Sequence, residues 1–212
     1  MIKIKIFVFN PFQENTFVLS DETSECIIVD PGCYSLQEKN ALDDYITSNT
    51  LKPVKIISTH GHVDHVLGTR HLVSKYSVPF EIHENDQQLL NDAQKLGVAF
   101  GFNVEEPPSV SSYLLENTNV EFGESKLQIL HVPGHSPGSV ALFCAEQKFV
   151  IVGDVLFKGS IGRTDLPGGS YDMLMKSIFS KLMTLPEDTE VFPGHGPATT
   201  IHDEALSNPF LA

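Results

Sequence analysis

The sequence predicts an α+β fold in which helices pack on the outer faces of β-sheets. Short apolar runs bounded by turn residues recur along the chain, which is typical of strands. Segments with an apolar residue every three or four positions lie between some of these runs, which is typical of amphipathic helices. The early strands follow one another through tight turns and the helices come later. We therefore expect sheets with helices packed outside them.

Nine apolar runs are predicted to be strands. The first alternates apolar and basic residues before it becomes wholly apolar, and this alternation is a strand pattern. Each of the nine is short and ends at turn residues. In chain order the predicted strands are Ile2–Phe9, Thr16–Leu19, Cys26–Val29, Val54–Ser58, Phe80–Ile82, Leu127–Val132, Val140–Phe143, Phe149–Val152 and Glu190–Phe192.

Four segments have helical spacing. In the fourth of them, a stripe of Met, Ile, Phe and Leu indicates core packing rather than a cofactor site. The predicted helices are Leu36–Ser48, His65–Tyr76, Glu84–Leu96 and Ser170–Met183. Residues 97–112 form a long irregular stretch, either a lid or pocket wall or a solvated insertion. The 212 residues suit one domain with a sizeable core, and no change of composition marks a boundary. We expect a single domain over residues 1–212.

The charge of the chain excludes some classes of partner. It has 14 basic and 27 acidic residues, which gives a net charge of −13. A surface this acidic repels phosphate backbones and anionic membrane surfaces, so we expect no nucleic-acid partner and no membrane partner. Bound divalent cations would offset part of this charge. The sequence favours no particular oligomeric state.

Cysteine usage and the N-terminal segment indicate a cytoplasmic protein. Three cysteines do not make a disulfide framework for a chain of this length, and they lack the Cys-x-x-Cys spacing of a thiolate metal site. The N-terminal segment has the pattern of a strand and not of a signal peptide. No stretch approaches the roughly 18 apolar residues that span a bilayer.

The clearest chemical signal is a cluster of four metal-ligand residue types directly after the predicted strand Val54–Ser58. His60, His62, Asp64 and His65 lie within six residues. Buried without partners, these side chains would cost several kcal/mol, and a divalent metal ion satisfies them well. In an extended chain His60 and His62 point the same way and can share one ion. Asp64 and His65 follow on a turn and can face a second ion.

Three more candidate ligands stand at the ends of later predicted strands. His135 and His195 each lie in a turn stiffened by Gly and Pro, which fixes the backbone and aims the side chain from the strand end. Asp154 directly follows the strand Phe149–Val152 and Gly153. A single such residue would be weak support for a metal site. Their repeated occurrence at strand ends makes coincidence a poor explanation, and the sequence predicts a metal centre.

In their order along the whole chain, His-x-His-x-Asp-His, Pro-Gly-His, Gly-Asp and Pro-Gly-His-Gly resemble the motifs of the metallo-β-lactamase superfamily. The segment Val29-Asp30-Pro31-Gly32 also fits, as the loop beneath the metals. The resemblance implies a four-layer αββα sandwich with the metal site at the edge of two sheets. It assigns the first metal to His60, His62 and His135, and the second to Asp64, His65 and His195. Asp154 becomes the bridging carboxylate.

The resemblance also implies metal-assisted hydrolysis. Two divalent ions lower the pKa of a shared water to about 7, which gives hydroxide for attack on an electrophilic carbonyl. Asp64 would both bind a metal and orient that water, so it is the predicted catalytic residue. A thiolate leaves readily as an anion and needs no general acid. We expect two divalent ions, with zinc the first choice, although iron and manganese also suit His and Asp ligands.

Within the superfamily, the segment after Asp154 is similar to the glyoxalase II (hydroxyacylglutathione hydrolase) branch. It reads Gly-Asp-x-Leu-Phe and then Gly-x-x-Gly-Arg, ending at Arg163. The resemblance implies that Arg163 contacts the thiol carrier of the substrate, and its guanidinium suits a carboxylate. The alternative is a surface ion pair between Arg163 and Asp165. Asp at position 154 and the absence of a signal peptide argue against a periplasmic antibiotic-degrading β-lactamase.

Two departures from glyoxalase II stand out. Only a short segment follows His195, so we expect no C-terminal helical glutathione-binding domain, and Thr164-Asp165 replaces the aromatic residues of that branch. The chain is therefore most similar to compact, single-domain glyoxalase II-like proteins, and the expected substrate is a small-molecule thioester. The alternatives are hydrolysis of a lactone or other ester, and persulfide oxidation by a single iron on His60, His62 and His135. A non-catalytic binding protein would be expected to lack some ligands.

Overall fold

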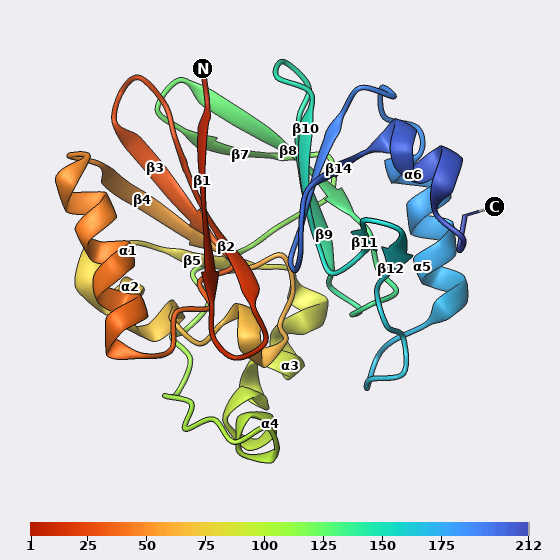
Figure 1. Ribbon diagram of the computed structural model, residues 1–212. Coiled ribbons are helices and arrows are strands. Elements are labelled where there is room, and N and C mark those ends of the chain that lie inside the picture. Colours follow the sequence, from red (N-terminus) through yellow and green to blue (C-terminus); the bar gives the residue numbers. More distant parts are fainter. Residues whose placement is uncertain (212) are drawn as a thin grey trace.

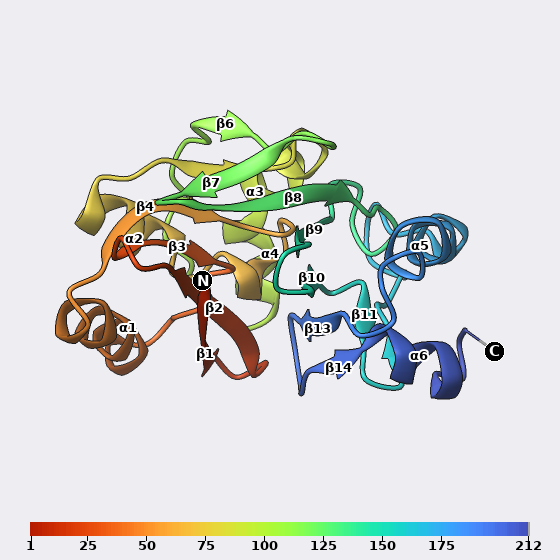
Figure 2. The same ribbon diagram turned by 90° about the horizontal axis from the view of Figure 1, so that it is seen from above.

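The structure, a computed structural model that describes residues 1–211, confirms the α+β fold. Two six-stranded sheets lie face to face, and helices cover their outer sides (Figures 1 and 2). The first sheet has the order β1-β2-β3-β4-β5-β6. Its strands are Lys3–Phe9 (β1), Glu14–Ser20 (β2), Glu25–Val29 (β3), Lys52–Ile57 (β4), Phe80–Ile82 (β5) and Ser112–Tyr113 (β6).

The second sheet comes from the C-terminal half of the chain and has the order β14-β13-β10-β9-β8-β7. Its strands are Asn119–Phe122 (β7), Ser125–His131 (β8), Val140–Cys144 (β9), Phe149–Gly153 (β10), Glu190–Pro193 (β13) and Thr199–Thr200 (β14). A separate two-stranded hairpin follows β10 in the chain. It consists of Leu156–Phe157 (β11) and Ser160–Ile161 (β12).

The helices are short, and several are single turns. The α-helices are Leu36–Ser48 (α1), Thr69–Tyr76 (α2), Gln87–Asn91 (α3), Ala93–Ala99 (α4), Tyr171–Ser177 (α5) and Ile201–Ser207 (α6). Two 3₁₀ turns, Val63–His65 (η1) and Glu84–Asp86 (η2), precede α2 and α3, and a π-helix, Ile178–Leu182 (η3), continues α5. Over residues 1–211, no helix combines the length and the apolar character needed to cross a membrane.

The layers follow from the alternation of side chains along each strand. On β2, Phe17 and Leu19 point into the core between the two sheets, whereas Val18 points to the opposite face. Leu142 of β9 joins the central core from the second sheet, and its neighbour Ala141 points outward. Both faces of each sheet are therefore buried, which explains why the strands are nearly continuous apolar runs.

Helices bury the outer face of each sheet. Leu42 of α1 and Leu72 of α2 pack with Val18 on the outer side of the first sheet. Leu174 of α5 and Ile201 of α6 pack on the outer side of the second sheet. Together with the core between the sheets, these two clusters produce the four-layer αββα arrangement that is visible from above in Figure 2.

The strands that carry the predicted ligands run in the same direction within each sheet. β3 and β4 are parallel, as are β10 and β13. β8 and β10 both pair antiparallel with β9, so they run the same way as each other. The two sheets are joined at the edge where these strands end, because Glu14 bridges His195 and the Asn15 amide donates to the Gly194 carbonyl at 2.7 Å.

Three predicted helices differ from the structure. The segment predicted as a helix from His65 begins as the 3₁₀ turn η1, and α2 starts only at Thr69. Gly68 explains the offset, because its amide donates to the Pro31 carbonyl at 2.7 Å and a Cβ there would lie 2.3 Å from Cys33 Sγ. The segment predicted as one helix over residues 84–96 forms η2, α3 and α4 instead. The segment predicted as a helix over residues 170–183 is α-helical only to residue 177 and continues as the π-helix η3. Strands β6, β7, β11, β12 and β14 and helix α6 were not predicted.

We predict that Phe17→Ala strongly destabilises the protein. Phe17 is fully buried between the sheets, and its ring lies 6.2 Å from that of Phe192 on the opposite sheet. The free energy of unfolding should fall by about 3–5 kcal/mol in chemical denaturation. As a control, Phe210→Ala removes a half-exposed ring and should change it by about 0.5 kcal/mol or less. Equal effects of the two substitutions would contradict the assigned core.

Candidate metal centre

The structure brings all seven predicted ligands together at the common edge of the two sheets. The loop after β4 carries His60, His62, Asp64 and His65. The loops after β8, β10 and β13 carry the other three. Six of the donor atoms form two compact sets, each with its atoms within 4.8 Å of one another. These sets are His60, His62 and His135, and Asp64, His65 and His195. Asp30, His60 and His65 form a third group of this kind, which joins the two sets.

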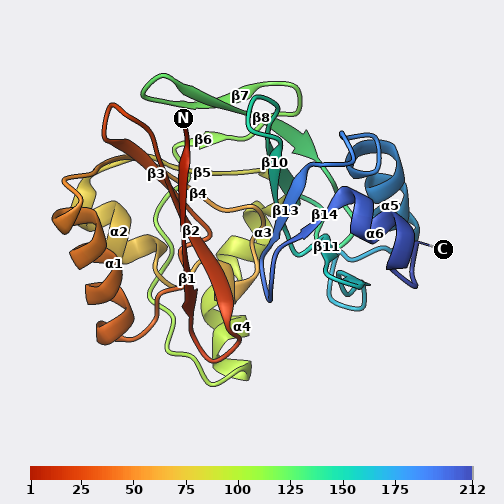
Figure 3. The same cartoon turned by 45° about the horizontal axis from the view of Figure 1, so that its top comes forward.

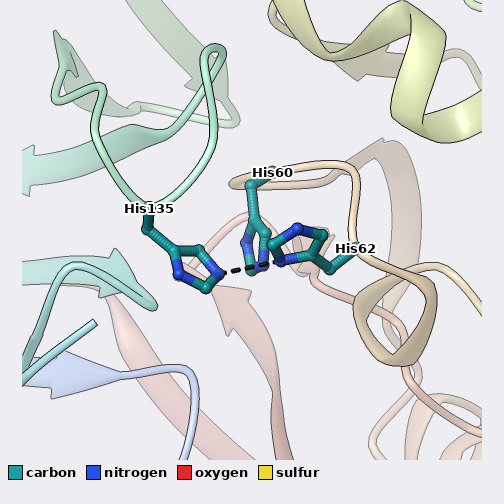
Figure 4. A group of neighbouring side chains, drawn as sticks. All are labelled: His60, His62 and His135. Atoms are coloured by element: carbon teal, nitrogen blue, oxygen red, sulfur yellow. Dashed lines mark hydrogen bonds between the residues drawn. The ribbon is translucent and has the colours of Figure 1, made fainter. Parts of the chain in front are cut away.

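The first set consists of three imidazole rings that converge on one point (Figure 4). His62 Nδ1 lies 2.8 Å from His135 Nε2, and the rings of His60 and His135 meet edge to face. His60 and His135 are buried, and His62 is partly buried. Two ring nitrogens in contact at this distance share at most one proton, so at least one of them presents a lone pair.

Contacts on the far side of two of these rings decide which nitrogen is free. Thr59 Oγ1 donates to Asp30 Oδ2 at 2.7 Å, so it accepts from His60 Nδ1 at 3.1 Å. His135 Nδ1 donates to the Arg163 carbonyl at 2.8 Å. Both contacts leave Nε2 unprotonated and aimed into the set, which is how partners behind metal-binding histidines usually fix the tautomer.

The second set has the same organisation. His195 Nε2 lies 3.2 Å from Asp64 Oδ2 and 3.3 Å from His65 Nε2. On the far sides, His195 Nδ1 donates to the Phe12 carbonyl at 3.0 Å, and His65 Nδ1 faces Asp30 Oδ2 at 3.2 Å. The Nε2 atoms of both rings are therefore turned toward Asp64.

Asp154 lies between the two sets. Its Oδ1 is 3.5 Å from His65 Nε2, and its Oδ2 is 3.7 Å from His135 Nε2 and 3.6 Å from His195 Nε2. Gly194 allows this approach, because a Cβ at that position would lie 2.2 Å from Asp154 Oδ1. A single carboxylate thus faces donors from both sets, as expected of a bridging ligand.

The electrostatics of the site favour the ligand forms of four of its side chains. Burial, together with the charges of neighbouring histidines, lowers the pKa of His60 well below its usual value and that of His62 to about 4. Burial acts to raise the pKa of Asp64 and of Asp154, but the contacts with His65 and His195 together lower both. Burial acts to lower the pKa of His65 and of His195, but the carboxylates of Asp64 and Asp154 raise both. Neutral imidazoles and ionised carboxylates are the forms that bind metal ions, so a bound ion would displace a proton from His65 and His195.

These residues fit two divalent cations. Buried His60 Nε2 and Asp154 Oδ1 have no hydrogen-bond partner within residues 1–211 although both point into the site. Leaving such groups unpaired is costly, and a cation between them would remove the cost. Two sets of three nitrogen and oxygen donors with a shared carboxylate suit zinc, iron or manganese.

Asp86 is a supporting residue that sequence analysis missed. Its buried carboxylate accepts from the Gly61 amide at 2.8 Å, from Ser136 Oγ at 2.6 Å and from the Gly138 amide at 2.5 Å. It therefore joins the loop of His60 and His62 to the loop of His135. The sequence offered one signal, because Asp86 lies shortly after a predicted strand, as the predicted ligands do. It was missed because it lies in no His-rich motif.

Two asparagines near the N-terminus fix the loops of the second set. Asn15 Nδ2 donates to the carbonyls of Pro193 and Gly196 at 2.9 Å each, on either side of His195. Asn10 Nδ2 donates to the carbonyl of Asp64 at 3.1 Å. The first hairpin thus positions loops that lie far away in the sequence.

A cleft in front of the ligands has two parts. One cavity of about 420 Å³ is bounded mainly by apolar side chains together with His62 and Asp64. An adjoining cavity of about 550 Å³ is bounded by the β11–β12 hairpin and includes Lys158. Arg163 lines both cavities.

The structure forms the predicted alternative contact of Arg163. Its Nε and Nη2 donate to the two carboxylate oxygens of Asp165 at 2.7 and 2.8 Å, and both side chains are largely exposed. The guanidinium nevertheless stays at the wall of the cleft. Contact between Arg163 and a substrate remains a prediction.

We predict that Asp86→Asn weakens metal binding about 10- to 100-fold, the usual range for a partner behind the ligands. The amide would present a donor where the carboxylate accepts, so the two loops should lose their alignment. Competition with a chromogenic chelator measures the affinity. Asp43→Asn is the matched control, because this buried carboxylate accepts from Lys75 and Tyr76, outside the ligand sets. An unchanged affinity in Asp86→Asn would contradict the role.

Comparison with known proteins shows the same fold and family. The chain is 40% identical to "Probable metallo-hydrolase YqgX" of Bacillus subtilis, over 95% of this chain and 93% of that protein. It is 35% identical to "Hydroxyacylglutathione hydrolase GloC" of Haemophilus influenzae, over 99% and 98%.

Two solved structures are also similar over nearly their full length. The BLEG-1 B3 metallo-β-lactamase superposes with a TM-score of 0.91 at 34% identity, covering 99% of this chain and 100% of that one. TTHA1623 in a di-iron-bound form superposes with a TM-score of 0.87 at 38% identity, covering 98% and 100%. The model of the metallo-β-lactamase superfamily matches residues 9–195, and the chain belongs to this superfamily.

Proposed function

We propose that the protein is a metal-dependent thioester hydrolase of the hydroxyacylglutathione hydrolase type. The observation that carries this proposal is the geometry of the site. Two three-ligand sets share Asp154, and Asp64 borders the adjoining cleft. The relative from Haemophilus influenzae named as a hydroxyacylglutathione hydrolase, 35% identical over 99% of this chain, supports the choice of substrate.

The proposed cofactors are two divalent cations, with zinc the first choice. His60, His62 and His135 would hold one, and Asp64, His65 and His195 the other, with Asp154 shared. When bound, such ions supply an activated water and a Lewis acid for the carbonyl oxygen. The similarity to a protein solved in a di-iron-bound form supports a two-ion site and keeps iron as the alternative.

The protein side chains would orient the reactants. Asp64 is partly exposed and lines the apolar part of the cleft, so it can hold the attacking water and accept its proton. The thiolate product needs no proton donor to leave.

The cations at the cleft wall suit the thiol carrier. Lys158 is exposed on the β11–β12 hairpin, and Arg163 lies near it at the same cavity. A carrier with carboxylates, such as glutathione, would place them here. Arg163 would then exchange its contact with Asp165 for the substrate carboxylate.

We predict that Asp64→Asn lowers kcat for thiol release from S-lactoylglutathione at least about 100-fold, because the amide cannot accept a proton. Asp44→Asn, an exposed carboxylate on α1, is the control and should keep full activity. Circular dichroism and metal analysis accompany the assay. A folded Asp64→Asn variant with wild-type turnover would contradict the assigned role.

We predict that Lys158→Ala and Arg163→Ala each raise KM for S-lactoylglutathione about two- to fivefold and leave kcat nearly unchanged, since exposed ion pairs contribute little. Lys148→Ala is the matched control, because Lys148 is exposed and pairs with Asp188 away from the cleft. A fall in kcat without a change in KM would place these side chains in the chemical step instead.

Hydrolysis of a β-lactam is the second candidate, because a solved structure described as a B3 metallo-β-lactamase is 34% identical over the whole chain. In a β-lactam the leaving group would be the ring nitrogen, which must gain a proton, whereas a thioester releases a thiolate. Zinc-loaded protein offered a chromogenic cephalosporin and S-lactoylglutathione in parallel distinguishes the two. Faster turnover of the cephalosporin would favour this second function.

A further inference from the structure

We propose that the acyl group of the substrate is a hydrocarbon chain, so that the enzyme prefers apolar acyl thioesters to hydroxyacyl thioesters. This inference rests on the proposed thioesterase function and specifies its substrate class. It is carried by the apolar part of the cleft, by the aromatic contacts at its mouth, and by the position of Lys158 in the other part.

The cavity of about 420 Å³ is apolar wherever it is not made of metal ligands or Arg163. The apolar residues come from the β1–β2 turn, η1, α3, α4 and two loops; they include Phe12, Val63, Leu89, Leu96, Phe100 and Leu166. Among the described residues, the wall contains no Ser, Thr, Asn, Gln or Tyr. A hydroxyl that lies among these apolar side chains would therefore give up water without gaining a partner, which disfavours it.

Aromatic rings at the mouth of the cavity hold one another in place. The ring of Phe12 lies 5.7 Å from that of Phe100 and 5.5 Å from that of Phe102, and Tyr34 packs edge to face on Phe102 at 5.0 Å. Phe102 is buried, but Phe100 remains 50% exposed. Figure 3 shows α4 beside the turn between β1 and β2, where this contact is made. An exposed ring fixed at a cleft suits an apolar ligand that covers it.

The two parts of the cleft would receive different parts of a thioester. His135, Asp154 and His195 line both cavities, so the metal site lies at their junction. Lys158 belongs to the second cavity only. When the thioester carbonyl lies at the junction and the charged carrier lies toward Lys158, the acyl chain lies in the apolar cavity.

The first test compares acyl groups on one carrier, glutathione, with zinc-loaded enzyme. Hexanoyl- and 6-hydroxyhexanoylglutathione differ only by a hydroxyl at the far end of the acyl chain, and kcat/KM should be about tenfold higher for the hexanoyl thioester. From acetyl to butyryl to hexanoyl, kcat/KM should rise by up to about fourfold per methylene. A flat series, or a preference for 6-hydroxyhexanoyl over hexanoyl, would overturn the inference.

The second test assigns the preference to the cavity. Leu96→Ala should lower kcat/KM for the hexanoyl thioester more than for the acetyl thioester, and so reduce the gain per methylene. Val98→Ala is the matched control, because Val98 lies on the same helix, is 74% exposed and does not line the cavity. An unchanged chain-length dependence in a folded Leu96→Ala variant would also overturn the inference.

The series also separates this inference from the function on which it rests. If no thioester in the series is hydrolysed, the proposed function fails and the inference fails with it. If all are hydrolysed without regard to the acyl chain, the thioesterase function stands and only the inference fails.

Discussion

The contact of Asp154 with histidines from both sheets is the constraint on which the rest of the structure depends. Asp154 lies within 3.7 Å of His65, which the first sheet carries, and of His135 and His195, which the second sheet carries. Neither sheet holds a complete site. The carboxylate of Asp154 attracts these three rings, and the core between the sheets fixes how far apart the two sides of the site lie.

That dependence explains why so many buried polar side chains near the edge bind backbone atoms rather than one another. Asp86 joins two ligand loops, and Asn15 joins the first hairpin to the loop of His195. Asp30 accepts from the Thr59 amide at 2.6 Å with its own backbone at φ 51°, a left-handed conformation that Asp tolerates better than most residues. Each of these contacts fixes a loop, and the loops fix the imidazoles.

The sequence was sufficient to predict which side chains meet at this edge, because these residue types are rare in such density. His60, His62, Asp64 and His65 cannot be explained as core, and Pro-Gly-His turns mark the ends of strands. The four-layer arrangement came from the resemblance carried by the same motifs. The structure gives the physical reason for the four layers. Phe17 and Val18 are neighbours on β2 that point to opposite faces of the sheet, and both are fully buried.

Other features depended on contacts between distant segments and could not be predicted. The break before α2 arises because Gly68 packs on Cys33 and Pro31, and no local pattern shows this. Asp86 looks like any acidic residue at the start of a helix until Gly61 and Gly138 are seen to donate to it. The apolar part of the cleft likewise forms only when Phe12 and Phe100, which lie far apart in the sequence, are brought into contact.

The central claim is that the edge of the two sheets holds two metal ions on two ligand sets. An anomalous difference map from a crystal of the zinc-loaded protein, recorded at the zinc edge, tests it most directly. The account predicts two peaks about 3.5–4 Å apart, one among His60, His62 and His135 and the other among Asp64, His65 and His195, with Asp154 between them. A single peak at the three histidines, or a peak at neither set, would contradict it.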